Sequence, residues 1–292
     1  SRVDFHYSIL FNEFRMISKV DEYMAETGLW QAIADGCDGE PLRYTSFCAD
    51  RMVMALAPQP GEKLLDVACG TGALTLAAAQ AVGPAGRVVA IDTAEPLLER
   101  LDAKLSKFGV ANVDVHVMDG ARLDFRRDYF HRVACSLAPF WLRDPATALA
   151  EWWRVLRPGG ELLVSSFAPG AFEPALGMLR SQLQAAGASP AALALPWDEW
   201  QDPARLVALL CDAGYEQVVV QSVAFSYHLK DVHQWWEVVQ FSWLRTLLLQ
   251  VAPAQRAGVE AAHLAALAEL VGADGLPMAV NVHFVRGRKP AA

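Results

Sequence analysis

The chain has 292 residues, of which 53% are hydrophobic and 20% are charged, so it can bury a large core and does not have the composition of a disordered chain. Its 25 Lys and Arg against 33 Asp and Glu give a net charge of −8, the wrong sign for neutralising a nucleic-acid backbone. We therefore expect no nucleic-acid partner. No apolar stretch reaches the roughly 18 residues of a membrane span, and residues 1–10 lack the apolar region of a signal peptide, so we expect a cytoplasmic protein.

The cysteines are odd in number and far apart in the sequence. Their five positions are 37, 48, 69, 135 and 211, with no C-x-x-C pair among them. Zinc sites and redox motifs use closely spaced pairs. We expect reduced cysteines and no metal site.

The predicted elements begin with an N-terminal helical arm over residues 1–57, with a break at 36–41. From 63 to 167, β-branched runs alternate with helical segments, which is typical of β–α units and a parallel sheet. Strands are predicted at 63–68, 87–91, 113–118, 132–136 and 161–167, and helices at 73–82, 95–108 and 145–156. Gly and Pro residues predict turns at 83–86 and 157–160.

The alternation breaks after residue 167. The sequence predicts helices at 172–186 and ending at Gly214, a strand at 216–229, helical structure over 232–270 and a last strand at 278–286. We divide the chain into the arm (1–57), an α/β core (58–167), a cap that includes the sixth strand (168–276) and the final core strand (277–292).

The sharpest motif is the run Leu64-Leu65-Asp66-Val67-Ala68-Cys69-Gly70-Thr71-Gly72, an apolar strand that leads into a glycine turn and then a helix. Glycines let the backbone approach a ligand closely, and the helix N-terminus offers free N–H groups. Thr75 stands where a dinucleotide fingerprint has its third glycine, which argues against a pyrophosphate ligand.

Asp66 followed by Cys69-Gly70-Thr71-Gly72 resembles motif I of the class I S-adenosylmethionine-dependent methyltransferases. The resemblance implies an α/β fold with a doubly wound, seven-stranded, mostly parallel sheet and S-adenosylmethionine as cofactor. It also implies that Gly70 and Gly72 pass near the methionine part of the cofactor, while Asp66 orients the turn and the ammonium group. Ala68, in the same turn, is also expected to bind the cofactor. The alternative is a structural turn in another α/β protein.

Two further acids follow the next two strands. Asp92 and Thr93 end the second strand, where the family binds the ribose hydroxyls; the alternative for Asp92 is a helix N-cap. Asp119-Gly120-Ala121 follows the third strand and resembles the family's adenine-binding turn. We expect the three acids to line one carboxyl edge of the sheet, where open α/β folds bind ligands.

The fourth strand and the region after it also resemble the family. Ser136 resembles a residue that flanks the sulfonium, and Tyr44 one that neighbours the cofactor; the alternative for Tyr44 is packing on its helix face. Residues 154–160 are similar to the ubiquinone/menaquinone-biosynthesis type. The chain departs from that type at Pro139-Phe140, in place of a histidine pair, and at Phe130-His131, in place of Phe-Asp. These departures argue against a quinone precursor as substrate.

The acceptor side of the site is predicted from histidines and tryptophans. His228 and His233 are candidate general bases, with a structural or surface role as the alternative. Aromatic residues could form a lid over an apolar acceptor, with core packing as the alternative: Trp141, Trp197, Trp200, Trp235, Trp236 and Trp243. We expect a methyltransferase acting on a small, largely apolar metabolite. A catalytically idle cofactor-binding subunit, or an enzyme using this fold for other chemistry, remains the alternative.

Overall fold

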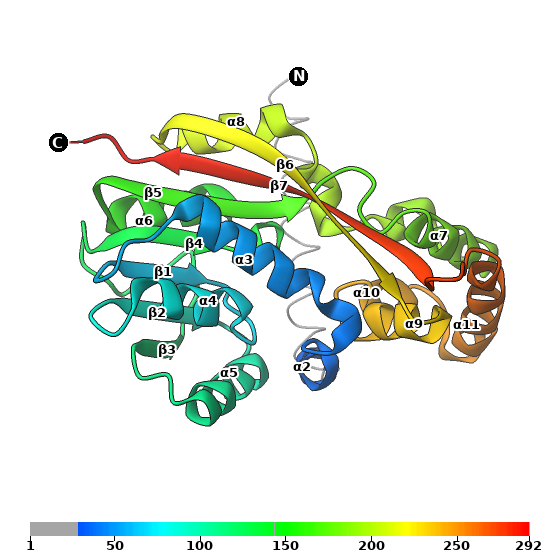
Figure 1. Cartoon of the computed structure of the whole chain (residues 1–292). Helices are drawn as coiled ribbons and strands as arrows, with labels where there is room; N and C mark the ends of the chain where they lie inside the picture. Colours follow the sequence, from blue (N-terminus) through cyan, green and yellow to red (C-terminus); the bar gives the residue numbers. More distant parts are fainter. Residues whose placement is uncertain (1–28, 143, 292) are drawn as a thin grey trace, which may run out of the picture.

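The computed structural model describes residues 29–142 and 144–291 of the chain (Figure 1). The first 28 positions of the predicted N-terminal arm lie outside these residues. The described part of the arm begins with α2 (Leu29–Gly36) and continues with α3 (Tyr44–Leu56). The break between them falls at the predicted place, where a short 3₁₀ turn, η1 (Glu40–Leu42), carries Pro41.

Seven strands of the described residues form one sheet in the order β3-β2-β1-β4-β5-β7-β6. The first five pair in parallel, and β7 pairs antiparallel with both β5 and β6. The strands are β1 (Lys63–Val67), β2 (Arg87–Asp92), β3 (Val113–Val117), β4 (Phe130–Cys135), β5 (Leu156–Phe167), β6 (Glu216–Leu229) and β7 (Leu276–Arg288). This topology confirms the predicted doubly wound α/β fold.

Helices cover both faces of the sheet, as its near-continuous apolar central strands require. Figure 1 shows α3 and α4 in front of the sheet and α6 behind it. The helices that follow the arm are α4 (Ala73–Val82), α5 (Glu95–Phe108), α6 (Pro145–Val155), α7 (Ala175–Ala185), α8 (Pro203–Asp212), α9 (Val232–Gln240), α10 (Arg245–Leu248) and α11 (Pro253–Ala268).

Three predicted elements differ from the structure. The turn expected at 157–160 is a bulge inside β5, where the Gly159 N–H donates to backbone carbonyls at 289 and 290. The helix expected from residue 172 begins at Ala175, because Phe172 has a left-handed φ of 65°. The helical stretch expected over 232–270 is three helices, and the last of them begins at Pro253, a residue suited to a first helical position.

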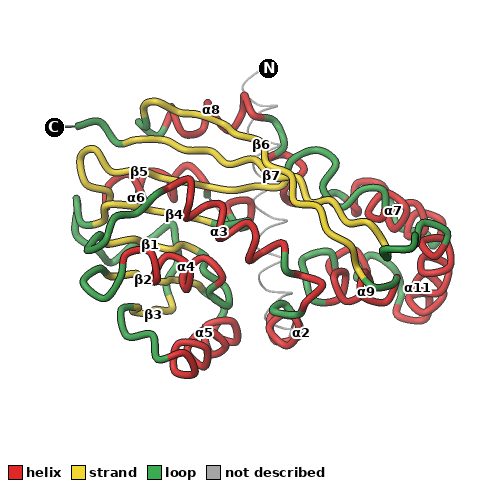
Figure 2. Tube along the Cα trace, viewed as in Figure 1, coloured by secondary structure: helices red, strands yellow, loops and turns green. Residues whose placement is uncertain are grey.

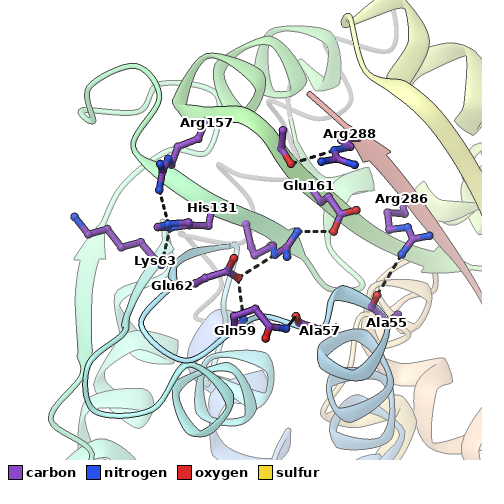
Figure 3. A network of polar contacts seen from close by, with 12 residues as sticks. Ala55, Ala57, Gln59, Glu62, Lys63, His131, Arg157, Glu161, Arg286 and Arg288 are labelled. Carbon is purple, nitrogen blue, oxygen red and sulfur yellow. Dashed lines mark hydrogen bonds and ion pairs between the residues drawn. The ribbon is translucent and has the colours of Figure 1, made fainter. Parts of the chain in front are cut away.

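The amino-terminal ends of the central strands are joined by a polar network (Figure 3). Arg132 of β4 pairs with Glu62 before β1 and with Glu161 of β5. His131 accepts a hydrogen bond of 3.0 Å from the Lys63 backbone N–H. The departure from the family's Phe-Asp pattern at this position therefore sits at the edge of the sheet opposite the strand ends that carry Asp92 and Ser136.

The antiparallel strands β6 and β7 are longer than the other strands of the sheet. Figure 2 shows both strands running past the core to reach α7, α9 and α11, so β6 belongs to the sheet and also borders the predicted cap. Our division of the chain at 168 and 277 stays a prediction.

A buried polar cluster joins three helices of the predicted cap, α7, α9 and α11. Trp235 of α9 donates through Nε1 to His263 Nε2 of α11 at 2.7 Å, which leaves the histidine proton on Nδ1. That Nδ1 lies 2.7 Å from Gln182 Oε1 of α7. His263 is fully buried, and burial lowers its pKa to about 4. The neutral His263 side chain thus links α7, α9 and α11 through hydrogen bonds.

We expect the free energy of unfolding to fall as pH drops from about 6.5 towards 4, because the unfolded chain takes up a proton that the folded His263 refuses. No stability is lost above about pH 6.5, and the loss amounts to about 2–3 kcal/mol by pH 4.5. Urea unfolding at several pH values should show a flatter profile for His263→Gln than for the wild type. His116→Gln, at an exposed position, is the control; equal slopes for His263→Gln and wild type would contradict the assignment.

Candidate functional site

A cavity of about 810 Å³ opens at the carboxyl ends of the central strands. Its floor comes from residues at the ends of β1, β2 and β4, and its walls from α2, α3 and the segment after α9. This volume is within the range of roughly 300–1,000 Å³ typical of small-molecule sites. The position is the edge of the sheet at which open α/β folds bind ligands.

The turn after β1 adopts left-handed backbone angles. Ala68, Gly70 and Gly72 have φ values of 53°, 54° and 87°. A non-glycine residue in this region is strained, so Ala68 marks a place where the surrounding structure imposes the backbone shape. At Gly72 a Cβ would lie 2.3 Å from Leu101 Cδ1, so α5 packs directly against the turn.

Asp66 is buried beneath this turn. Its Oδ2 accepts from Thr75 Oγ1 at 2.6 Å, while its Oδ1 is buried without a partner in the described residues. Burial raises its pKa to about 7, and the negative charge of Asp92 adds to the shift. A buried carboxylate with a free oxygen beside a cavity is suited to a cationic or hydrogen-bond-donating group of a ligand.

Asp92 ties the end of β2 to the glycine turn. Its Oδ2 accepts from the Gly70 N–H at 2.8 Å and its Oδ1 from the Ala94 N–H at 2.9 Å. The alternative of a helix N-cap at Asp92 is wrong, because α5 begins at Glu95 and Ala94 holds the N-cap position. Burial raises the pKa of Asp92.

Asp119 lies on the exposed rim. Its Oδ1 accepts from the Ala121 N–H at 2.9 Å, which shapes the turn after β3. Gly120 has no room for a side chain, since a Cβ would lie 2.7 Å from Val67 Cγ1, and its carbonyl accepts from Trp152 Nε1. The structure thus brings Asp66, Asp92 and Asp119 to one cavity.

Most of the predicted cofactor residues line this cavity. Those that do are Tyr44, Asp66, Ala68, Gly70, Asp92, Thr93, Asp119, Gly120 and Ser136. Gly72 and Ala121 do not line it: Gly72 provides the left-handed start of α4, and Ala121 donates to Asp119. Both residues therefore help to shape the site without lining the cavity.

The structure does not bring His228 and His233 to the cavity, contrary to their predicted position beside the acceptor. Both side chains are exposed, and neither lines the cavity. His228 sits near the end of β6, where its carbonyl accepts from Arg43 Nη2, and His233 is in the first turn of α9. The long β6 strand carries both positions away from the carboxyl ends of the central strands. Their closeness in sequence to the expected acceptor region did not indicate this distance.

No motif in the sequence indicated the part of the site formed by α2. Trp30, Ile33 and Cys37 line the cavity from this helix and its end. Trp30 packs against Trp243 with ring centroids 4.7 Å apart, and Trp243 against Trp141 at 4.1 Å. The amphipathic pattern of α2 indicated that one face of this helix packs against other residues, but it did not identify those residues.

The lining has an acidic and an aromatic part. Four carboxylates line it, from Asp66, Asp92, Glu95 and Asp119, and the described lining includes no Lys, Arg or His. Three residues of metal-ligating type do not cluster anywhere within 29–142 and 144–291, and no helix there is long and apolar enough to cross a membrane. The acidic part favours a cationic ligand group by charge.

Comparisons with known proteins place the chain among methyltransferases. A family profile described as "Methyltransferase domain" matches residues 64–160. Nocamycin O-methyltransferase of Saccharothrix syringae is 38% identical over 45% of this chain and 48% of its own length. The ubiquinone/menaquinone biosynthesis C-methyltransferase UbiE of Bordetella parapertussis is 41% identical over 38% and 43%. The chain thus spans about half the length of these two relatives. Aklanonic acid methyltransferase DauC of a Streptomyces species is 30% identical over 58% of this chain and 81% of its own length.

Solved structures share the fold. A SAM-dependent methyltransferase from Aquifex aeolicus has a TM-score of 0.52 at 16% identity, over 86% of this chain and 94% of its own. The 4+2 cyclase SpnF has a TM-score of 0.55 at 21% identity, over 85% and 81%. At these identities the likeness shows the fold alone.

We expect Asp66→Asn to stabilise the ligand-free protein at pH 8, because a carboxyl with a raised pKa costs stability once it ionises. The cost is absent below about pH 3.8 and complete above about pH 7, so the gain should be about 2–4 kcal/mol at pH 8 and shrink towards pH 4. Urea unfolding at pH 8 and pH 5 measures it, with Asp124→Asn at an exposed site as control. A gain that does not grow with pH would refute the buried-charge argument.

Gly72→Ala should destabilise the protein more than Gly61→Ala. Both glycines have a φ of 87°, but a Cβ at Gly61 meets no atom within 4 Å, whereas at Gly72 it meets Leu101. We expect a loss of about 1–2 kcal/mol at Gly61 from the backbone alone, and about 1–3 kcal/mol more at Gly72 from overpacking. Denaturant unfolding of the two variants compares them directly. Equal losses would mean that Leu101 moves aside freely.

Proposed function

The chain belongs to the class I S-adenosylmethionine-dependent methyltransferases, and we propose that it transfers a methyl group from this cofactor to a small, largely apolar metabolite. One observation carries the proposal: a single cavity has an acidic part at the strand ends and an aromatic part beneath α2 and the segment after α9. The acidic part suits a cationic cofactor, and the aromatic part suits an apolar acceptor.

Each acid has a proposed role in holding S-adenosylmethionine. Asp66 has a buried oxygen without a partner, which fits the ammonium group; Asp92, at the end of β2, fits the ribose hydroxyls. Asp119 on the rim fits the adenine amino group. Five further residues would contact the cofactor through their backbone or small side chains: Ala68, Gly70, Thr93, Gly120 and Ser136. The donors and acceptors present thus fit this cofactor.

When bound, S-adenosylmethionine supplies a methyl group already activated by its sulfonium. The chain therefore has to hold the acceptor in line with that group and keep water out. The described lining is suited to positioning: the pKa of the Tyr44 phenol is raised far above its usual range by burial, and burial also raises the pKa of the Cys37 thiol. Both side chains stay protonated near neutral pH, so neither serves as a general base there.

Two relatives support a small-molecule acceptor, since their names give nocamycin and aklanonic acid methylation. Of the two departures from the quinone-type pattern, Pro139-Phe140 bears on the acceptor. Phe140 is buried against Phe167, which lines the cavity, and against Trp197. The departure at His131 lies at the opposite edge of the sheet and says nothing about the substrate. The cytoplasmic location stays a prediction.

Calorimetric titration with S-adenosylmethionine and S-adenosylhomocysteine, with NAD as control, tests the cofactor. We expect micromolar binding of the first two and none of NAD. Formation of S-adenosylhomocysteine that depends on added acceptor then tests turnover. Cofactor binding without turnover on any acceptor would favour an idle subunit, and acceptor conversion without S-adenosylhomocysteine would favour other chemistry on this fold.

Asp92→Ala should weaken S-adenosylmethionine binding by about 1.5–3 kcal/mol, the range of a hydrogen bond to a charged group. The variant removes the proposed ribose acceptor and also the partner of the Gly70 N–H. Calorimetry on folded protein measures the loss, and Asp114→Ala, on a β3 residue paired with Arg87 outside the cavity, is the control. Unchanged affinity in a folded Asp92→Ala protein would remove Asp92 from the cofactor site.

A further inference from the structure

Three tryptophans from distant parts of the sequence meet at the cavity. Trp30 lies on α2, Trp141 ends the 3₁₀ helix η2 (Pro139–Trp141), and Trp243 lies between α9 and α10. The rings of Trp30 and Trp243 are perpendicular, and the planes of Trp141 and Trp243 are tilted by 33° with their centroids 4.1 Å apart. All three line the cavity, and we call them the aromatic wall.

The aromatic wall differs from the cap tryptophans in burial. Trp197, Trp200, Trp235 and Trp236 are buried in the core, as their size favours. The three wall residues are only half-buried, although they lie inside a concave site. Ring surface left uncovered in a cavity is available to a ligand.

Fixed contacts hold the wall in place without a ligand. The end of α2 abuts the Phe241 ring so closely that a Cβ at Gly36 would lie 2.2 Å from it, which sets α2 beside the segment that carries Trp243. Asp35 at the end of the same helix pairs with Arg100 of α5 at 2.9 Å.

A second set of contacts links the segment after α2 to the glycine turn. Asp38 accepts from Thr71 Oγ1 at 2.7 Å and from Lys104 Nζ at 2.6 Å. Lys104 Nζ also donates to the Thr71 carbonyl. The wall is therefore preorganised on the same frame as the cofactor site, which lowers the entropy cost of binding a rigid ligand.

The aromatic wall also borders Ser136, one of the residues proposed to contact the cofactor. Trp141 follows Ser136, Leu137 and Ala138 after β4, and these residues line the same cavity. Taking the proposed function as its basis, we propose that the aromatic wall binds the acceptor and selects a planar aromatic ring system over a saturated one of equal size. Trp243, which packs against both other rings, is the specificity-determining residue.

The physical basis is the geometry of aromatic contacts. A flat π-system can lie against one indole offset and against another edge-on, and each such contact adds about 3- to 10-fold in affinity beyond the area that it buries. A puckered saturated skeleton buries similar area without these contacts. Within the wall itself, one pair of rings is edge-on and the other is face-to-face with a tilt of 33°.

The test uses 2-naphthol and 2-decalol, which share a bicyclic carbon skeleton and a hydroxyl but differ in planarity. Their affinities are measured by calorimetry on the full chain saturated with S-adenosylhomocysteine. We expect 2-naphthol to bind about ten-fold more tightly than 2-decalol. Trp243→Leu should abolish that preference, Trp243→Phe should keep most of it, and S-adenosylhomocysteine affinity should be unchanged in both.

Trp153→Leu is the control for loss of a tryptophan outside the cavity, since Trp153 lies on α6 and donates to the Gly214 carbonyl. Equal affinities of the two probes for the wild type, binding of neither, or a preference that survives Trp243→Leu overturns the inference. These results leave the proposed function standing if S-adenosylhomocysteine binds. Absence of S-adenosylhomocysteine binding to the wild type refutes the proposed function instead.

Discussion

The hydrogen bond from the Gly70 N–H to the Asp92 carboxylate fixes the part of the molecule on which the site depends. It joins the turn after β1 to the end of β2, two strands that already pair in parallel with Val67 opposite Ile91. Leu101 of α5 closes the turn from behind at Gly72. The floor of the cavity is therefore an extension of the buried core, and its geometry is as rigid as the sheet that carries it.

This rigid floor holds charge in a place where charge is costly. Asp66 and Asp92 are both buried, and burial raises the pKa of each. An uncompensated buried carboxylate destabilises the ligand-free protein, and a cationic group placed beside it relieves that cost. The affinity for a cation and the instability of the ligand-free form that we predict thus have one physical source.

The sequence predicted well what depends on neighbours along the chain. Helices α4 and α5 and strand β6 have the predicted bounds, and the glycine turn lies where its motif places it. The sequence did not predict the features that depend on contacts between segments far apart in the chain. The bulge at the start of β5 depends on backbone carbonyls at 289 and 290, and the positions of His228 and His233 depend on the full length of the β6–β7 pair. The contribution of α2 to the cavity required knowing that Trp30 meets Trp243.

The same distinction separates the two halves of the cavity. The acidic half is built by consecutive strand ends, so a local motif is enough to identify it. The aromatic half is built by side chains from α2, η2 and the segment after α9, which no local pattern connects. Because the Gly70–Asp92 contact involves none of the three wall tryptophans, a change at Trp243 can alter what the aromatic half accepts while the cofactor floor keeps its shape. With the acceptor and the cofactor bound as proposed, this architecture allows acceptor choice to vary independently of cofactor binding.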